Sequence, residues 1–482
     1  MIVPYALEIS VVCVGIFLLM VDAFLKTDKT TIAWTGVVVL LAIFGMTFFL
    51  SPMPVGAIPS SFYVLDPAAL FFKRFLLLAT VLTLILSIDY SPVYLKFVPS
   101  AAPQAGLGEF FTLPIFACAG MMWMVSANDF IMIFVALELV TISFYVLVAS
   151  MRKNQGSLEA GVKYLILGAL STGFLVYGIT WIYGITGFTA LDGISSVLPR
   201  VPEQYQPSVL FGLGLVLVAL GFKVAAVPFQ FWVPDVYQGA PTPVTAYLSV
   251  ASKAAGFVVL LRVLDPFLSV AAFQGKVFGI LTILAAVTLI LGNLAAMSQQ
   301  NLKRLLAYSS IAHAGYLLVA VASLSAPGAK VAIGFYLGGY LVMTFLAFLV
   351  LLNVAKVSGG DDIRDFNGLG KRSPVLALGL LIAMLSLAGL PFTIGFLGKF
   401  FIFEAALASG QYVLVVLGAI TVACGFYYYL KVVMAMYWQP AAPSATNIQV
   451  SPFGHFLIGL LVLAIILFGI FPQPLLGALT HL

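Results

Sequence analysis

Four lysines and one glutamate occupy stretches of the chain that are otherwise almost entirely apolar. The lysines are Lys163, Lys223, Lys253 and Lys399, and the glutamate is Glu138. A charged side chain near the centre of a lipid bilayer costs about 2.5–3.5 kcal/mol on insertion scales. One such residue can extend its charge to the interface, but several indicate a buried path for charge. The pattern therefore favours ion or proton translocation.

Glu138 and Lys223 are the predicted carboxylate and amine of one site. Glu138 lies in NDFIMIFVALELVTISFYVL, which contains no basic residue. An unpaired carboxyl in such a stretch would be protonated, whereas a lysine from a neighbouring span would hold it ionised. A pair of changing geometry could then load and release a proton. A static ion pair that holds two helices together is the structural alternative.

The other lysines differ in how strongly they point to a relay. Lys163 lies early in LEAGVKYLILGALSTG, about one turn from Glu159, so it could also reach the cytoplasmic interface. Lys253 lies deeper, and Ser249, Ser252 and several small residues flank it and leave room for water. We expect a relay role for Lys253.

His313 and Lys399 extend the same prediction to the second half of the chain. His313 lies midway along NLKRLLAYSSIAHAGYLLVA, and its unperturbed pKa near 6.5 suits a proton relay. The alternative is a histidine that is simply hydrogen-bonded in the core. Lys399 stands near the end of its apolar run and is a candidate exit group.

Two of these lysines stand beside prolines that would break a helix. Pro228 follows Lys223, and Pro391 precedes Lys399 within a glycine-rich segment. A proline inside a helix leaves a carbonyl without its N–H donor, which at membrane depth is tolerated where protein or a water-filled cavity satisfies it. Many transporters place such broken helices in corresponding positions of two inverted halves. A simple proline kink is the alternative.

Spans long enough to cross a bilayer must position these residues. The chain is 62% hydrophobic and 8% charged, against roughly 25% charged residues in a soluble domain. About 20 apolar residues cross a bilayer as a helix. The sequence predicts an all-α membrane protein with fourteen spans, at 5–25, 32–50, 67–88, 109–126, 128–150, 158–187, 208–233, 240–262, 275–297, 302–324, 330–353, 374–403, 411–437 and 453–471. The span at 158–187 is long enough to include a loop at its end.

The basic residues predict the orientation of these spans. With both termini outside, eleven lysines and arginines fall in cytoplasmic loops, and four lie at the outer side, namely Arg200, Arg262, Lys276 and Lys330. This asymmetry follows the positive-inside rule. We expect three N-terminal helices in 1–108, two inverted five-helix halves in 109–262 and 275–437, and a C-terminal helix in 438–482.

No cofactor chemistry is evident in the sequence. The three cysteines are scattered singly, and no spacing of His, Cys, Asp or Glu matches a metal site. No phosphate loop or dinucleotide fingerprint is present, and the net charge of +5, mostly on loops, implies no nucleic-acid partner.

Three runs of sequence carry a resemblance to a known family. They are GFKVAAVPFQFWVPDVYQGAPTPVTAYLSVASKAAGF, NLKRLLAYSSIAHAGYLL and DDIRDFNGLGKRSPVLALGLLIAMLSLAGLPFTIGFLGKF. They resemble the antiporter-like membrane subunits of respiratory complex I, most strongly those of the bacterial NADH–quinone oxidoreductase subunit N type. The likeness covers roughly residues 109–437. Lys399, where another antiporter-like subunit carries glutamate, favours the N type.

The resemblance implies a function and a set of partners. Glu138, Lys163, Lys223, Lys253 and Lys399 would match the family's proton-path residues, and His313 a histidine between the half-channels. The chain would be a translocase subunit without a redox site of its own, in a bacterial inner membrane beside other antiporter-like subunits. NADH, FMN, iron–sulfur clusters and quinone would belong to partner subunits, where quinone reduction would drive the pump.

Gln230 departs from the family's pattern, in which many members carry histidine after VPF. Glutamine cannot titrate, so a proton route that requires a titrating side chain there is in doubt. Two other functions stay open from the residues alone. An Mrp-type cation/proton antiporter would have nearly the same half-channels, whereas a non-transporting scaffold would need none of the buried lysines.

Overall fold

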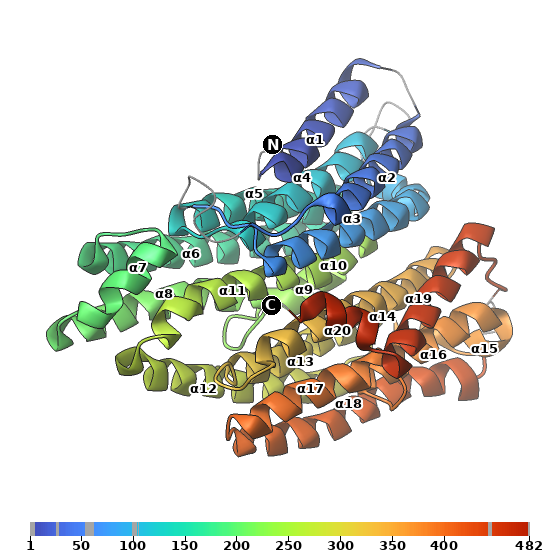
Figure 1. The fold of residues 1–482 in the computed structure, drawn as a ribbon. Helices are drawn as coiled ribbons and strands as arrows, with labels where there is room; N and C mark the ends of the chain where they lie inside the picture. The colour runs from blue at the N-terminus through green and yellow to red at the C-terminus, as the bar shows by residue number, and fades with distance from the viewer. Residues whose placement is uncertain are drawn as a thin grey trace. The chain divides into compact units, whose positions relative to one another are not determined.

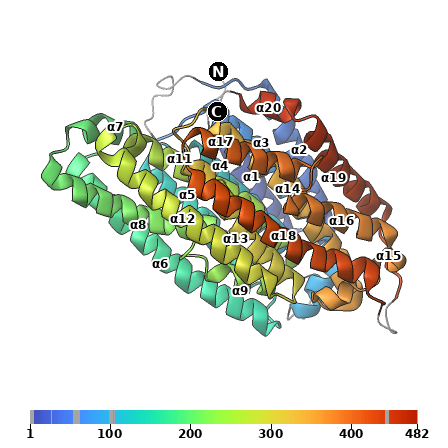
Figure 2. The same ribbon diagram turned by 90° about the horizontal axis from the view of Figure 1, so that it is seen from below.

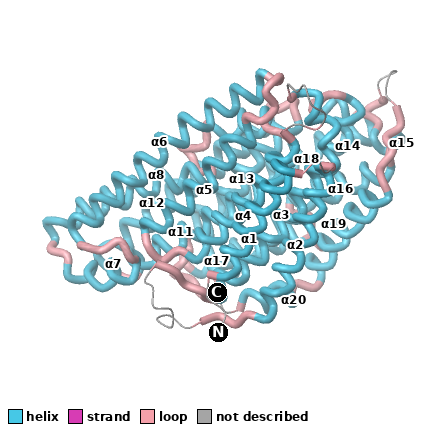
Figure 3. The backbone as a smooth tube through the Cα atoms, turned by 90° about the horizontal axis from the view of Figure 1, so that it is seen from above, coloured by secondary structure: helices cyan, strands magenta, loops and turns pink. Residues whose placement is uncertain are grey.

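The computed structural model describes residues 5–25, 28–53, 62–98, 104, 106–441 and 446–480. Helices dominate these residues, and the backbone tube in Figure 3 contains no strand among them. Thirteen helices in the described part of the chain are long and apolar enough to cross a membrane. The prediction of an all-α membrane protein is therefore confirmed.

The chain divides into two compact units, each described here by itself. Unit 1 comprises Met1–Ala225 and Gly239–Gly279, and unit 2 comprises Ala226–Gln238 and Ile280–Leu482. The α-helices that lie wholly in unit 1 are α1 (Ala6–Phe24), α2 (Lys29–Met46), α3 (Pro67–Tyr94), α4 (Leu107–Ser126), α5 (Phe130–Val148), α6 (Gln155–Thr186), α7 (Leu191–Val197), α8 (Gln206–Val224), α10 (Thr242–Tyr247) and α11 (Lys253–Leu268).

The remaining α-helices belong to unit 2, apart from α12 (Ala271–Met297), which begins in unit 1 and continues into unit 2. They are α9 (Trp232–Gly239), all but its last residue, α13 (Leu302–Val321), α14 (Ala329–Ser358), α15 (Leu369–Arg372), α16 (Pro374–Ala388), α17 (Ile394–Ala408), α18 (Tyr412–Trp438), α19 (Pro452–Ile470) and α20 (Gln473–Leu479).

Unit 1 is built around α3, α4 and α11. The helix α4 packs against α1, α3, α5 and α11, and α6 lies along α8 (Figures 1 and 2). A short π-helix, η5 (Leu248–Ser252), joins α10 to α11, so that Lys253 directly follows it. Both α10 and η5 contact α3. The helix α11, which begins at Lys253, is thereby held against the N-terminal helices.

Unit 2 is built around α14. This helix contacts α13, α16, α17 and α19, and α18 covers α16 and α17 (Figure 1). Almost nine-tenths of the most apolar window of α14 is buried. Apolar side chains all round a helix are typical of one enclosed by others.

Three predicted spans differ in detail from the structure. The span at 158–187 includes no loop, because α6 is one helix that starts at an Asn154 cap and ends at Gly187 in the left-handed region (φ 73°). The span at 374–403 is two helices, α16 and α17, of 15 residues each. The span at 208–233 ends at Val224, and α9 follows after a short loop. The last two are the predicted broken helices, and both breaks are present.

Candidate functional site

The break in unit 1 leaves Lys223 in the last turn of α8. Ala225 ends this helix in the left-handed region (φ 67°), with its N–H bonded back to Gly221 and Phe222. The Lys223 side chain is buried, and Gly256 of α11 leaves room for its aliphatic stem. Its Nζ atom makes no hydrogen bond among the described residues. A buried ammonium group without a partner is costly, which is typical of functional sites.

Glu138 lies on α5 and is half-buried. Its Oε1 accepts a hydrogen bond from Thr172 of α6 at 2.6 Å. The predicted direct ion pair between Glu138 and Lys223 is not formed among the described contacts. Thr172 donates to one oxygen of the carboxylate, and Lys223 Nζ has no hydrogen bond among the described residues.

Lys163 and Lys253 differ sharply in their surroundings. Lys163 pairs with Glu159 one turn earlier on α6, at 2.6 Å, and its side chain is 42% exposed. The structure thus forms the contact with Glu159 that the spacing of about one turn indicated. Lys253 is buried at the start of α11, directly after the π-helix. Single-turn π-helices are frequent at functional sites.

In unit 2, Lys399 itself bridges the break between α16 and α17. Gly389 ends α16 at φ 94°, and Lys399 reaches back from α17 to the end of α16. Its Nζ donates to the carbonyls of Leu387 (2.9 Å) and Ala388 (2.8 Å). A Cβ on residue 389 would lie 3.1 Å from the Lys399 side chain, so glycine serves both the turn and the contact. A cation at the negative end of a helix is stabilised there.

His313 lies at the centre of a cluster of hydroxyl groups in unit 2. Its Nδ1 contacts Tyr336 Oη at 2.5 Å, and its Nε2 contacts Tyr429 Oη at 3.1 Å. Tyr429 is also hydrogen-bonded to Ser309. The ring of Tyr316 touches the His313 ring edge-on and carries Lys399 Nζ over its face, 4.9 Å from the centroid. His313 and Lys399 thus both contact the ring of Tyr316.

The sequence identified His313 and Lys399 as candidates but not the three tyrosines that contact His313. The available signal was position: Tyr316, Tyr336 and Tyr429 stand inside apolar spans, whereas membrane tyrosines are enriched at the two interfaces. All three are buried. A buried tyrosine hydroxyl needs a partner, which makes each one a marker of a polar interior.

Gln230 lies in the segment 226–238 of unit 2. Its side chain is buried, and its Oε1 has no hydrogen-bond donor among the described residues. The segment is held by Val227 N to Thr288 Oγ1 (3.0 Å), Tyr237 Oη to Ser310 Oγ (3.1 Å) and Asp235 to Arg304 (2.8 Å). These contacts keep the second piece of the broken helix in place.

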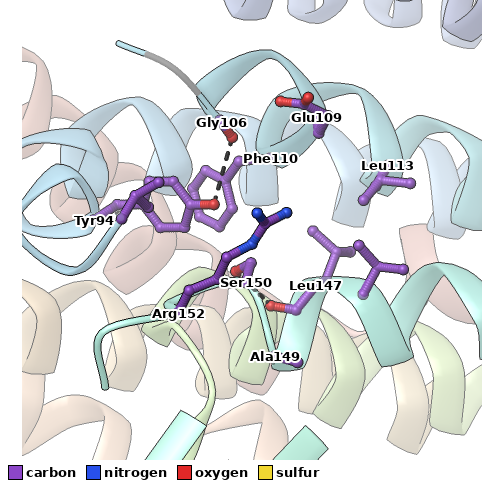
Figure 4. A pocket seen from close by; sticks show the side chains of 11 residues that line it. Tyr94, Gly106, Glu109, Phe110, Leu113, Leu147, Ala149, Ser150 and Arg152 are labelled. Carbon is purple, nitrogen blue, oxygen red and sulfur yellow. Dashed lines mark hydrogen bonds between the residues drawn. The ribbon is translucent and has the colours of Figure 1, made fainter. Parts of the chain in front are cut away.

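A cavity of about 380 Å³ lies at the far end of α3 from the Asp66 cap of that helix, between α3, α4 and α5 (Figure 4). Tyr94 stacks on Phe110 in its wall, with ring centroids 4.2 Å apart, and the Arg152 guanidinium extends into it beside Leu147. None of the predicted proton-path residues lines it. This cavity is therefore separate from the predicted proton path.

These features define a class of membrane protein. A many-span α-helical membrane protein with two broken helices, each beside a buried lysine, has the construction of an antiporter-like ion translocator. The comparisons with known proteins agree. Residues 127–425 match the family described as NADH:quinone oxidoreductase/Mrp antiporter, TM.

Curated relatives and a solved structure extend the match along the chain. NADH-quinone oxidoreductase subunit N of Trichlorobacter lovleyi is 40% identical, covering 96% of this chain and 95% of the relative. Subunit N 2 of Chloroherpeton thalassium is 38% identical, covering 96% and 91%. A chain of respiratory complex I from Thermus thermophilus, solved with bound aureothin, superposes with a TM-score of 0.80 at 32% identity, covering 98% and 99%. This chain belongs to the NADH:quinone oxidoreductase/Mrp antiporter family, among its subunit N members.

Proposed function

We propose that the chain is a proton-translocating membrane subunit of an NADH–quinone oxidoreductase complex. The observation that carries this proposal is the pair of broken helices, each with a buried lysine whose Nζ pairs with no carboxylate among the described residues. Such groups change charge more easily than paired ones, which a proton relay requires. The strong likeness to subunit N proteins supports the partner complex.

The relay residues are Glu138, Lys223 and Lys253 in unit 1, and His313 and Lys399 in unit 2. Lys163 remains a predicted member of the route, and its side chain pairs with Glu159. The predicted inverted halves, 109–262 and 275–437, each contain one of the two breaks. Positive-inside counting supports both termini on the outer side of a bacterial inner membrane.

The energy must come from partner subunits. Moving one charge against 100 mV takes about 2.3 kcal/mol, and no reaction within this chain releases it. NADH oxidation and quinone reduction, with their flavin and iron–sulfur cofactors, belong to those partners. The chain itself contributes no redox group, so its part is to hold, orient and release protons.

The Lys253→Met substitution tests this function in the purified complex reconstituted in liposomes. We expect fewer protons moved per NADH oxidised, because methionine keeps the length and volume of the side chain but cannot bind a proton. The substitution Met297→Leu, at the end of α12, controls for a change of similar size in an apolar side chain. An unchanged proton ratio with Lys253→Met would support the non-transporting scaffold. Sodium-linked transport by this chain alone would support the Mrp-type antiporter.

A further inference from the structure

The cavity between α3, α4 and α5 combines an apolar wall with two charged side chains. Phe110 and Leu113 of α4 and Leu147 of α5 supply apolar lining. Glu109 lies in the first turn of α4, and Arg152 lies in the turn that follows α5 (Figure 4). The volume of about 380 Å³ is within the range of about 300–1,000 Å³ that is usual for ligand pockets. The cavity is therefore large enough to hold a small charged group.

The two charges at the cavity do not neutralise each other. Glu109 and Arg152 form no ion pair, with each other or with another of the described residues, and both side chains are exposed. A guanidinium group only donates hydrogen bonds, and an ionised carboxylate only accepts them. A ligand with a negative group at one end and a donor of positive charge at the other therefore complements this pair.

The turn that carries Arg152 is fixed by hydrogen bonds on both sides. Ser150 Oγ donates to the carbonyl of Leu147 at 2.7 Å. The backbone N–H of Lys153 donates to the carbonyl of Phe97, just after the end of α3, at 2.8 Å. Because the backbone around Arg152 is already ordered, less conformational entropy is lost when its guanidinium binds a ligand.

Helix ends on one side of the protein surround the cavity. The helix α3 ends at Tyr94, α4 begins at Leu107 and α5 ends at Val148. Positive-inside counting assigns this side, which carries Arg152, to the cytoplasm. Phospholipid headgroups lie at the ends of membrane-spanning helices, and basic pockets between such helices on the cytoplasmic side bind them. The position of the cavity therefore favours a lipid headgroup as its ligand.

An apolar stripe on the outer face of α5 leads away from the cavity. It consists of Val146, which borders the cavity, Ile142 and Val135, and each of the three is more than half exposed. Positions four and eleven residues apart lie on one face of an α-helix. From Val146 to Val135 the stripe extends about 16.5 Å, close to half of the hydrocarbon thickness of about 30 Å. An acyl chain from one leaflet therefore fits along it.

The charges at the cavity also select among phospholipid headgroups. Arg152 suits a phosphodiester, because a guanidinium group can donate two parallel N–H bonds to phosphate oxygens. Glu109 suits a primary ammonium group, which can donate to its carboxylate, and repels a further negative charge. An anionic headgroup would satisfy Arg152 alone, and a quaternary ammonium group has no N–H to donate to Glu109.

We propose that this cavity binds one phospholipid with a phosphoethanolamine headgroup. Arg152 binds the phosphate, Glu109 binds the ammonium group, and an acyl chain follows the apolar stripe of α5. The lipid comes from the leaflet that meets the ends of α3 and α5. None of the predicted proton-path residues lines the cavity, so the lipid site stands independently of the proposed function.

Photo-crosslinking in the intact complex tests this site, in vesicles that contain one photoactivatable lipid at a time. The probes are phosphatidylethanolamine, phosphatidylcholine and phosphatidylglycerol with the same diazirine-bearing acyl chain. The measurement is the labelling of α5, by mass spectrometry, relative to α6, whose outer face is largely exposed. We expect phosphatidylethanolamine to label α5 more than the other two lipids do.

Two substitutions separate the contacts of the headgroup. Arg152→Gln should lower labelling of α5 by phosphatidylethanolamine on the order of tenfold, because a charge-assisted contact is lost. Glu109→Gln should abolish the preference over phosphatidylglycerol, because the carboxylate that repels the anionic headgroup is gone. Lys153→Gln is the matched control: it removes an exposed positive charge next to Arg152, and Lys153 does not line the cavity. It should leave the labelling unchanged.

A third substitution tests the path of the acyl chain. Val146→Trp places a large ring where the stripe meets the cavity and should lower the labelling of α5 by phosphatidylethanolamine. Val162→Trp, at an exposed position of α6, is its control and should not. Equal labelling of α5 by the three lipids, stronger labelling by phosphatidylglycerol, or unchanged labelling in Arg152→Gln would overturn the site.

Discussion

The lysines at the two helix breaks are held in opposite ways. In unit 1, Lys223 belongs to the helix that ends at the break, and its Nζ has no hydrogen bond among the described residues. In unit 2, Lys399 belongs to the helix that follows the break and donates to two carbonyls at the end of the preceding one. The first lysine therefore has no hydrogen-bonded anchor among the described residues, whereas two backbone carbonyls anchor the second. We infer that Lys399 contributes to holding its break together and that Lys223 does not.

Lys399→Met should have the largest effect, because it removes the lysine that is anchored by two carbonyls. Two buried carbonyls would lose their donor, at a cost on the order of 1–3 kcal/mol each. We expect both a lower thermal stability of the complex and a loss of proton pumping, measured by a melting curve and by the proton ratio in liposomes. An unchanged melting temperature would show that the carbonyls have another donor.

Lys223→Met should affect pumping without the loss of stability. No hydrogen bond of Lys223 Nζ is broken, and a desolvated charge is removed, so the melting temperature should stay the same or rise. The proton ratio should fall, as it should with Glu138→Gln, because both variants remove one of the two interacting charges. Equal destabilisation by the Lys223 and Lys399 substitutions would contradict the contrast between the units.

Thr172→Val should have a smaller effect, since it leaves Glu138 in place. The substitution removes the hydroxyl that donates to Glu138 Oε1 and so frees the carboxylate to turn toward other donors. We expect a partial loss of proton pumping, less than with Glu138→Gln, at a normal rate of assembly. Thr180→Val, on the exposed side of the same helix, provides the control, because among the described residues its hydroxyl bonds to the nearby carbonyl of Tyr177 alone. A full loss of pumping would mean that Thr172 itself carries the proton.

Gln230→His should have the smallest effect. Gln230 is buried, and its Oε1 has no hydrogen-bond donor among the described residues. A histidine ring N–H in its place would not need such a donor. We expect normal assembly and a normal proton ratio near neutral pH, measured in the same liposomes. Loss of assembly would show that the segment 226–238 is packed too tightly to admit the ring.

The sequence predicted the positions of the breaks because proline and glycine act locally. Pro391 has no N–H to give to the carbonyl of Leu387, four residues earlier, and Lys399 donates to that carbonyl instead. The contacts of Glu138 could not be predicted, since Thr172 lies 34 residues away on another helix. Nor could the exposure of Lys163, which depends on the face that α6 turns outward. Periodicity gives the helices, but which faces meet is decided by packing.

The tyrosines around His313 and the buried ion pair between Glu8 and Lys73 were missed for a related reason. Lys73 lies within the predicted span at 67–88, and the sequence gives it no role. Its partner Glu8 is 65 residues earlier, in a segment that is almost entirely apolar. A buried pair of opposite charges leaves no trace in local sequence. It becomes visible only when the helices that carry the two residues are placed side by side.

The segment 226–238 also constrains how the protein is made. It packs with unit 2, yet the chain on both sides of it belongs to unit 1. Its ion-pair partner, Arg304, is synthesised 69 residues after Asp235, which at about 5–20 residues per second takes roughly 3–14 s. During that time a short, proline-broken piece must wait in the insertion machinery or at the membrane without its final neighbours. Biogenesis of this chain is therefore non-sequential at this point, and a ribosome stalled between these two residues would leave the segment unplaced.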